Sequence, residues 1–179
     1  MNCWLFKTEP EAFSFDDLLA APRRTTGWDG VRNYQARNLL RDEMEKGDQV
    51  LIYHSRVEPM SVVGEAEIVR AGYPDPTQFE KKHNHYDPDS LLDEPRWYQV
   101  DVRAVAKLGR PVTLGEMKAE PELRGMALLR RGNRLSVQPV TEAEYHAVLR
   151  LGLRGGTGRD GGPGGRGGPG GSGGAGSTR

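Results

Sequence analysis

The sequence predicts an α+β domain built on a mixed, barrel-like sheet of five or six strands, with short helices closing its ends. Three observations lead to this fold class: the apolar segments are short, they alternate with helical segments, and their spacing is irregular. A doubly wound parallel sheet would require more regular spacing. Five segments have the pattern of strands, namely residues 3–7, 49–54, 61–70, 97–105 and 135–140.

Side chains alternate along these strands, which predicts the face of the sheet on which each one lies. In residues 3–7, the alternation separates Trp4 and Phe6 from Cys3, Leu5 and Lys7. In residues 49–54, it separates Val50 and Ile52 from Leu51 and Tyr53. In residues 61–70, it separates Val62, Gly64, Ala66 and Ile68 from Val63, Glu65, Glu67 and Val69.

Helices are predicted where a capping residue precedes apolar residues at helical spacing. Ser14 and Asp17 form a capping box before a short helix that Pro22 ends, and Asn33 caps a second helix that Gly47 stops. Residues 77–94 predict a small helix and an irregular loop, and short helices are expected over 113–119 and 122–129. Thr141 and Glu144 form a second capping box at the start of the last helix. The apolar stripe of this helix consists of Tyr145, Val148, Leu149 and Leu151.

Composition divides the chain into one domain and a tail. Residues 1–151 contain all the predicted strands and most of the apolar residues, and they have the usual size of a domain. Residues 152–179 are rich in glycine and arginine and contain almost nothing that could be buried. Because such a segment cannot offset its ordering entropy by apolar burial, we expect a disordered tail.

The charge balance excludes a protein that coats nucleic acid through charge alone. The chain has 25 lysines plus arginines and 25 aspartates plus glutamates, whereas such binding depends on neutralising phosphates. Cys3 is the only cysteine, which excludes an internal disulfide and fits a reducing compartment. No apolar run has the length of a membrane span, and we expect a cytoplasmic protein, or a nuclear one if the source has a nucleus.

Aromatic and polar residues gather at the ends of predicted elements, in residues 7–10, 28–34, 53–55 and 130–136. A flat heteroaromatic ligand needs apolar faces to stack on and a few polar groups at its edge. Trp28, Tyr53 and Trp97 could supply the faces. The polar edge groups would be Lys7, Glu9, Asn33 and Ser55, and arginines that could hold phosphates are Arg32, Arg37 and Arg134. The structural alternatives are that the aromatics belong to the core and the arginines to a solvated helix face.

A catalytic site has less support from the sequence. His54 and Ser55 are adjacent on a strand and therefore point in opposite directions, which excludes a nucleophile–base dyad. A hydrolase using His54 or the pair Glu65 and Glu67 remains a third hypothesis, although the sequence contains no recognisable triad or phosphate loop.

A metal site is not predicted either. His83 and His85 lie close to Asp87 and Asp89 in a polar loop, which is an arrangement of ligand types that could bind an ion. The loop has neither zinc-like spacing nor a cysteine partner, so we expect no metal and no cofactor.

Residues 28–37, WDGVRNYQAR, resemble the EVE domain, a PUA-like family. The resemblance continues, in the family's order, through KTEP at 7–10, YHS at 53–55, YPD at 73–75, HYDP at 85–88, RW at 96–97, VDV at 100–102 and RLSVQP at 134–139. It implies a PUA-like pseudo-barrel with a pocket between sheet and helices. The family is thought to bind modified cytosines in DNA, or modified bases more broadly, with no established catalytic activity.

Carried over by motif, the resemblance implies a set of ligand-binding residues. They are Lys7, Glu9, Trp28, Asn33, Tyr34, Tyr53, His54, Ser55 and Trp97, with Arg32, Arg37 and Arg134 towards the nucleic-acid backbone. We therefore predict a non-catalytic domain that flips a modified base, most simply a modified cytosine in DNA, into an aromatic-lined pocket. The alternative is a reader of modified tRNA or rRNA, for which the Arg/Gly tail resembles flexible RNA-binding segments.

Overall fold

The computed structural model describes residues 1–153, so the predicted tail lies almost wholly outside the described residues. Six strands form one mixed sheet in the order β2-β5-β4-β3-β1-β6. Their bounds are β1 (Cys3–Thr8), β2 (Thr25–Gly27), β3 (Gln49–His54), β4 (Ser61–Pro74), β5 (Tyr98–Thr113) and β6 (Val137–Val140). Only β1 and β3 pair in parallel, and the other neighbours are antiparallel. The predicted mixed sheet is confirmed, and β2 and β6 remain as its two edges, so the barrel is not closed.

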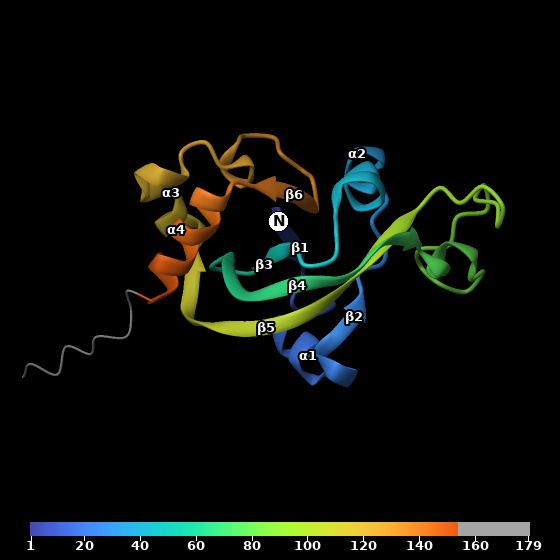
Figure 1. Cartoon of the computed structure of the whole chain (residues 1–179), viewed down its shortest axis with the longest axis horizontal. Helices are drawn as coiled ribbons and strands as arrows, with labels where there is room; N and C mark the ends of the chain where they lie inside the picture. Colours follow the sequence, from blue (N-terminus) through green and yellow to red (C-terminus); the bar gives the residue numbers. More distant parts are fainter. Residues whose placement is uncertain (154–179) are drawn as a thin grey trace, which may run out of the picture.

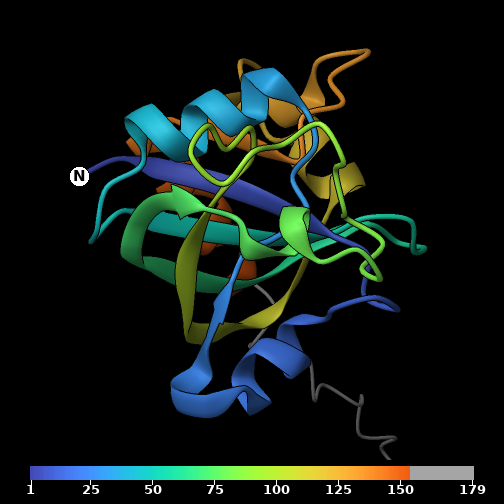
Figure 2. The same cartoon turned by 90° about the vertical axis from the view of Figure 1, so that its right-hand side faces the viewer.

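In the described part of the chain, four α-helices surround this sheet (Figure 1), namely α1 (Phe15–Ala20), α2 (Tyr34–Asn38), α3 (Leu114–Ala119) and α4 (Glu142–Leu153). The side view places α2 above the sheet and α1 below it (Figure 2). The capping box of Ser14 with Asp17 and the cap of Asn33 are both confirmed, because each side chain accepts a backbone N–H of its helix. Thr141 and Glu144 exchange the same kind of hydrogen bonds at the start of α4. No helix within residues 1–153 is long and apolar enough to span a membrane.

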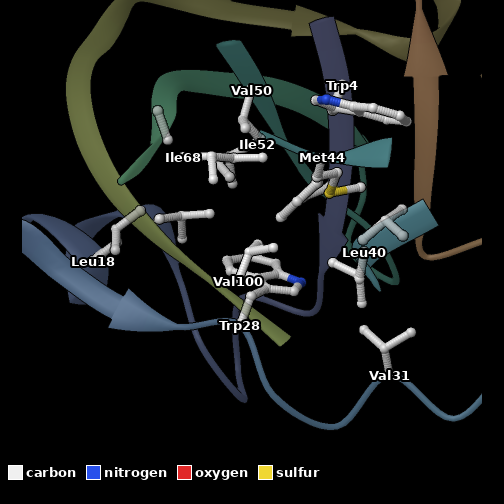
Figure 3. Packing of buried hydrophobic residues seen from close by; sticks show 14 of the residues in the cluster. Trp4, Leu18, Trp28, Val31, Leu40, Met44, Val50, Ile52, Ile68 and Val100 are labelled. Carbon is white, nitrogen blue, oxygen red and sulfur yellow. The ribbon is translucent and has the colours of Figure 1, made fainter. Parts of the chain in front are cut away.

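The two faces of the sheet carry two separate cores, as the alternation predicts. Val50 and Ile52 lie in a first core with Trp4 and Phe6, to which Leu18, Trp28 and Val100 also belong (Figure 3). Leu51 and Tyr53 lie in a second core with Cys3 and Leu5, beneath α3 and α4. Members of the second core from these helices include Met117, Tyr145 and Val148.

The prediction for β4 is wrong at Val62 and Val63, because the strand contains a bulge. Ile52 pairs with Gly64 and Tyr53 with Val62, so Val63 is an extra residue between them. The bulge moves Val62 into the second core, while Val63, Ala66 and Ile68 belong to the first. A β-bulge has no signature in a simple alternation, so the sequence pattern continues through it unchanged.

Four further elements differ from the prediction. β5 continues to Thr113 instead of ending near residue 105, because the long strand β4 remains paired with it. β2 was not predicted, since a three-residue edge strand has too few residues to show alternation. The helix predicted over 122–129 is replaced by two 3-10 turns, Pro121–Leu123 and Ala127–Leu129. The second helix continues from α2 into a π-helical segment, Leu39–Glu43.

Candidate functional site

A pocket of about 400 Å³ opens beside the first core, at the C-terminal end of β1. Its volume lies in the range of small-molecule sites. Three segments line it: the end of β1 with the residues before α1, the chain from β2 to residue 29, and the loop that follows β4. The lining residues are Lys7, Thr8, Ala12, Phe13, Thr26, Gly27, Trp28, Asp29, His83, Asn84 and His85.

Trp28 lines this pocket and also belongs to the first core, in which Figure 3 shows its side chain. Trp28 as a whole is 8 % exposed, and its ring lies 5.2 Å from the ring of Phe6 and 6.3 Å from that of Phe13, centroid to centroid. Its backbone N–H donates to the Val100 carbonyl at 2.8 Å, which attaches the segment to β5. A rigid aromatic wall of this kind suits a flat ligand, because the wall loses little conformational entropy on binding.

The polar groups of the pocket include both a cation and hydrogen-bond acceptors. Lys7 is half-buried, and burial lowers the pKa of its ammonium group. Asp29 is exposed, and its Oδ2 lies 3.6 Å from Nδ1 of His85. That nitrogen is buried and has no hydrogen-bond partner. Because a buried polar atom without a partner is costly, this nitrogen marks a place where a ligand would gain an interaction.

Asp75 connects the segment of Trp28 to the loop of His85. Its buried carboxylate accepts hydrogen bonds from the Gly30 N–H at 2.9 Å and from Arg32 Nη1 at 2.8 Å. Arg32 in turn donates from Nη2 to the His85 carbonyl at 2.8 Å. Burial alone would raise the pKa of Asp75, but the hydrogen bonds from Thr77, Gly30 and Arg32 hold it below its usual value. The carboxylate therefore stays ionised and fixes two walls of the pocket relative to each other.

Gly30 allows these two walls to approach. Its φ is +77°, a conformation that costs about 1–2 kcal/mol for most residues with a side chain. A Cβ at this position would also lie 2.2 Å from Cε1 of His85. The imidazole of His85 therefore lies directly on the backbone of Gly30, which only glycine permits.

A family model, the EVE domain, matches residues 2–151 of the chain. The chain belongs to the EVE domain family. Among curated relatives, human thymocyte nuclear protein 1 is 44% identical over 165 residues, which cover 83% of this chain and 72% of the human protein. The zebrafish protein of the same name is also 44% identical over 165 residues, covering 83% of this chain and 71% of that protein.

Two solved structures of the EVE fold are similar to this one. A hypothetical protein from Leishmania major has a TM-score of 0.81 and 44% identity, and the match covers 86% of this chain and 96% of that one. Human THYN1 in complex with 5-methylcytosine-containing DNA has a TM-score of 0.80 and 43% identity, covering 85% of this chain and 98% of that chain.

Of the nine ligand residues expected for this EVE domain, the structure brings Lys7 and Trp28 to the pocket. Tyr34 and Trp97 instead stack on each other outside its lining, with centroids 5.0 Å apart. Trp97 donates its indole N–H to Asp87 at 2.7 Å and is 7 % exposed, whereas Tyr34 is 54 % exposed. Trp97 is therefore held in place by the fold, and Tyr34 presents an aromatic face to solvent.

The residues of the YHS motif have structural contacts. Tyr53 is buried in the second core, on the opposite face of the sheet from Trp28, so the structure does not bring it to the pocket. His54 Nε2 accepts the Phe15 N–H at 3.1 Å, at the start of α1, and the Ser55 N–H donates to the Thr8 carbonyl at 2.9 Å. Glu9 is exposed and paired with Arg56 at 3.2 Å.

Replacing His54 with glutamine should flatten the decline in stability on acidification. Burial lowers the pKa of His54, an effect that Asp16 opposes, so the native state favours the neutral ring. The stabilising contribution is present above the unfolded pKa of about 6.5 and is lost as the pH falls towards the lower folded value. Urea unfolding between neutral and mildly acidic pH measures this slope, and the exposed His146→Gln is the control. An unchanged slope in His54→Gln would contradict this structural role.

The three arginines expected at the nucleic-acid backbone have different positions. Arg32 is bound to Asp75 and His85, and its guanidinium lies 5.3 Å from the Trp97 ring centroid. Arg37 donates to the Arg96 carbonyl at 2.6 Å and lies over the Tyr34 ring. Arg134 is exposed in a groove of about 540 Å³ that also contains Arg130, Arg131, Asn33 and Gln35. Arg130, Arg131 and Arg134 are thus exposed in this basic groove, whereas Arg32 is held by Asp75 and the His85 carbonyl.

The carboxylates considered for catalysis have partners within the fold. Glu65 accepts the hydroxyl of Tyr145 at 2.7 Å, and Glu67 forms an ion pair with Arg103. Burial and the hydrogen bond to Glu65 raise the pKa of Tyr145. The Glu65 contact thus joins α4 to β4, and the Glu67 ion pair joins β5 to β4.

Sequence reasoning missed the pocket residues that come from loops. Phe13, Asp29 and Asn84 were not proposed as ligand residues, and His83 and His85 were considered only for a metal site. Asp29 lies inside the WDGVRNY motif, so its charge beside an aromatic residue was an available signal. The approach of His85 to Asp29 depends on Asp75 and Arg32, and no local pattern reveals such a contact.

Proposed function

We propose that this EVE domain is a non-catalytic reader of a modified base in nucleic acid, which it holds in the pocket beside Trp28. The observation that carries the proposal is a cavity of nucleobase-compatible size with an aromatic wall, polar residues in its lining and one buried lining atom, His85 Nδ1, without a hydrogen-bond partner. A relative of similar structure, human THYN1, has been solved with 5-methylcytosine-containing DNA, which supports DNA as the ligand.

Extrusion of a base from a duplex costs a few kcal/mol, which contacts in the pocket must offset. Stacking of a base on an aromatic side chain contributes about 1–3 kcal/mol. In this pocket Trp28 and Phe13 provide the aromatic surface. The chain has no net charge. Nonspecific attraction between its surface as a whole and the phosphates therefore cannot supply the rest of the binding free energy.

The polar rim favours a base with an exocyclic amino group. The Asp29 carboxylate accepts hydrogen bonds, as aspartate does from the cytosine amino group, and Lys7 donates. Cytosine presents an amino donor beside two acceptors, the ring N3 and the carbonyl O2, so it complements this pair. Thymine and uracil would place a carbonyl oxygen against Asp29, where two acceptors repel each other. We infer that the ligand is a base with an exocyclic amino group beside a ring acceptor, and the solved complex of human THYN1 with 5-methylcytosine-containing DNA favours cytosine among such bases.

A 5-methyl group would add apolar surface to this ligand. Burial of one such carbon contributes about 0.8 kcal/mol, which corresponds to an increase in affinity of about fourfold. The methylated base is thus expected to bind better than cytosine by a modest factor, and the factor sets the precision that a binding assay needs.

The experiment that tests the proposal is a titration of the full chain with matched oligonucleotides containing cytosine, 5-methylcytosine or 5-hydroxymethylcytosine at one position, as DNA and as RNA. We expect the methylated DNA to bind most tightly. Equal affinities across the DNA series would overturn the proposal for DNA. Discrimination confined to the RNA series would favour the alternative, a reader of modified RNA.

Arg134→Ala should weaken binding to every oligonucleotide by the same factor, because Arg134 lies in the basic groove outside the base pocket. Loss of one phosphate contact should reduce the slope of log affinity against log salt by about 0.9 for duplex DNA. Fluorescence anisotropy at several salt concentrations measures both effects. Arg150→Ala is a matched control, since Arg150 already pairs with Glu122 at 2.5 Å. A changed preference between cytosine and 5-methylcytosine in Arg134→Ala would contradict this assignment.

A further inference from the structure

We propose that Asp29, His83 and His85 form a binding site for a divalent transition-metal ion of the zinc class at the rim of the pocket. Each residue offers one ligand atom, and the three atoms lie within 4.8 Å of one another. The site does not depend on the proposed function, because it is defined by donor atoms that already converge.

The donors come from two segments that are far apart in the sequence. Asp29 follows β2, whereas His83 and His85 belong to the loop after β4, and Arg32 joins the segments by donating to Asp75 and to the His85 carbonyl. The sequence had offered Asp87 and Asp89 as the carboxylates. Asp87 instead accepts the indole N–H of Trp97, and Asp29 takes the third position.

Individual atoms of the cluster are suited to an ion. Nδ1 of His85 is buried, has no hydrogen-bond partner and lies 3.6 Å from Asp29 Oδ2, which is too far for a hydrogen bond. An ion between the two would satisfy both. Nδ1 of His83 accepts the His85 N–H at 3.1 Å, and coordination through this nitrogen would replace that hydrogen bond.

The donor set indicates the class of ion. Two imidazoles and one carboxylate suit Zn²⁺ and its neighbours, whereas Mg²⁺ and Ca²⁺ prefer oxygen donors. Three protein ligands leave at least one position open, as in zinc sites that bind a water or a substrate group.

The ion would share Asp29 with the proposed base pocket. If that function holds, an ion and a cytosine-type base compete for the same carboxylate, and Zn²⁺ should lower the affinity for methylated DNA. The metal site itself is tested without nucleic acid, so its failure and the failure of the base pocket are distinguishable.

The test is calorimetric titration of the full chain, freed of metal with EDTA, with ZnCl₂ alone. We expect one saturable site, and a loss of at least about 100-fold in affinity in His83→Ala and in His85→Ala, since removing even a group that only orients a ligand costs 10–100-fold. His146→Ala, whose imidazole is exposed on α4, is the matched control and should bind like the wild type.

Visible absorption of the Co²⁺-substituted protein gives a second measurement, because its bands change when imidazole ligands are lost. Circular dichroism verifies that each variant folds, and should His85→Ala unfold, His83→Ala decides the question. The absence of saturable binding in the wild type would overturn the proposal. Unchanged affinity in His83→Ala would also overturn it, because the ion would then bind elsewhere.

Discussion

Asp75→Ala is expected to lower the free energy of unfolding by about 3–5 kcal/mol, the cost of removing one partner of a buried ion pair. The Asp75 side chain is fully buried, and its loss leaves Arg32, whose side chain is 23% exposed, without its carboxylate partner. It also leaves the N–H groups of Gly30 and Thr77 without their acceptor. Since Arg32 then no longer holds the loop of His85, ligand binding should fall even where the protein remains folded.

Chemical denaturation measures this effect, with Asp89→Ala as the control. Asp89 is exposed and lies 3.6 Å from Arg96 in a surface ion pair, so its removal should change stability by less than about 1 kcal/mol. A loss in Asp75→Ala no greater than in Asp89→Ala would show that the carboxylate does not hold the two walls together.

Asp29→Asn is expected to remove the preference for 5-methylcytosine over thymine. Thymine carries the same methyl group but presents a carbonyl oxygen where cytosine presents an amino group. A correct hydrogen-bonding pair contributes about 1–3 kcal/mol of discrimination between bases. An asparagine amide can both donate and accept, and so it tolerates either base.

Single-stranded oligonucleotides should be used for this comparison, because duplexes would differ in the cost of extruding a mismatched base. Asp16→Asn is the control, since Asp16 is an exposed carboxylate paired with Lys107 at 2.8 Å. If Asp29→Asn keeps the wild-type ratio of affinities for the two bases, Asp29 does not read the amino group. If the wild type binds neither base selectively, the proposed pocket itself is wrong.

The sequence predicted the parts of the fold that depend on local pattern. The faces of β1 and β3 follow from strict alternation, and the caps at Ser14 and Asn33 follow from residue type at a fixed spacing. The bulge at Val63 could not be predicted, because it depends on how β4 pairs with β3. β2 could not be predicted either, since its three residues are specified by pairing with β5.

For the candidate site, the sequence predicted the strand end and the aromatic wall but not the rim. Lys7 lies near the C-terminal end of β1 and Trp28 directly follows β2, and both line the pocket. Tyr53 is also an aromatic residue near the end of a strand, yet its position in β3 places it in the second core. The contact of Asp29 with His85 joins segments 56 residues apart and depends on the buried Asp75, so it required the structure.

A crystal structure of this protein with a 5-methylcytosine oligonucleotide would show where the modified base lies. We predict that the base is extruded and lies against Trp28, with its amino group facing Asp29. A base that remains stacked in the nucleic acid, or one that lies on Tyr34 and Trp97 instead, would contradict it.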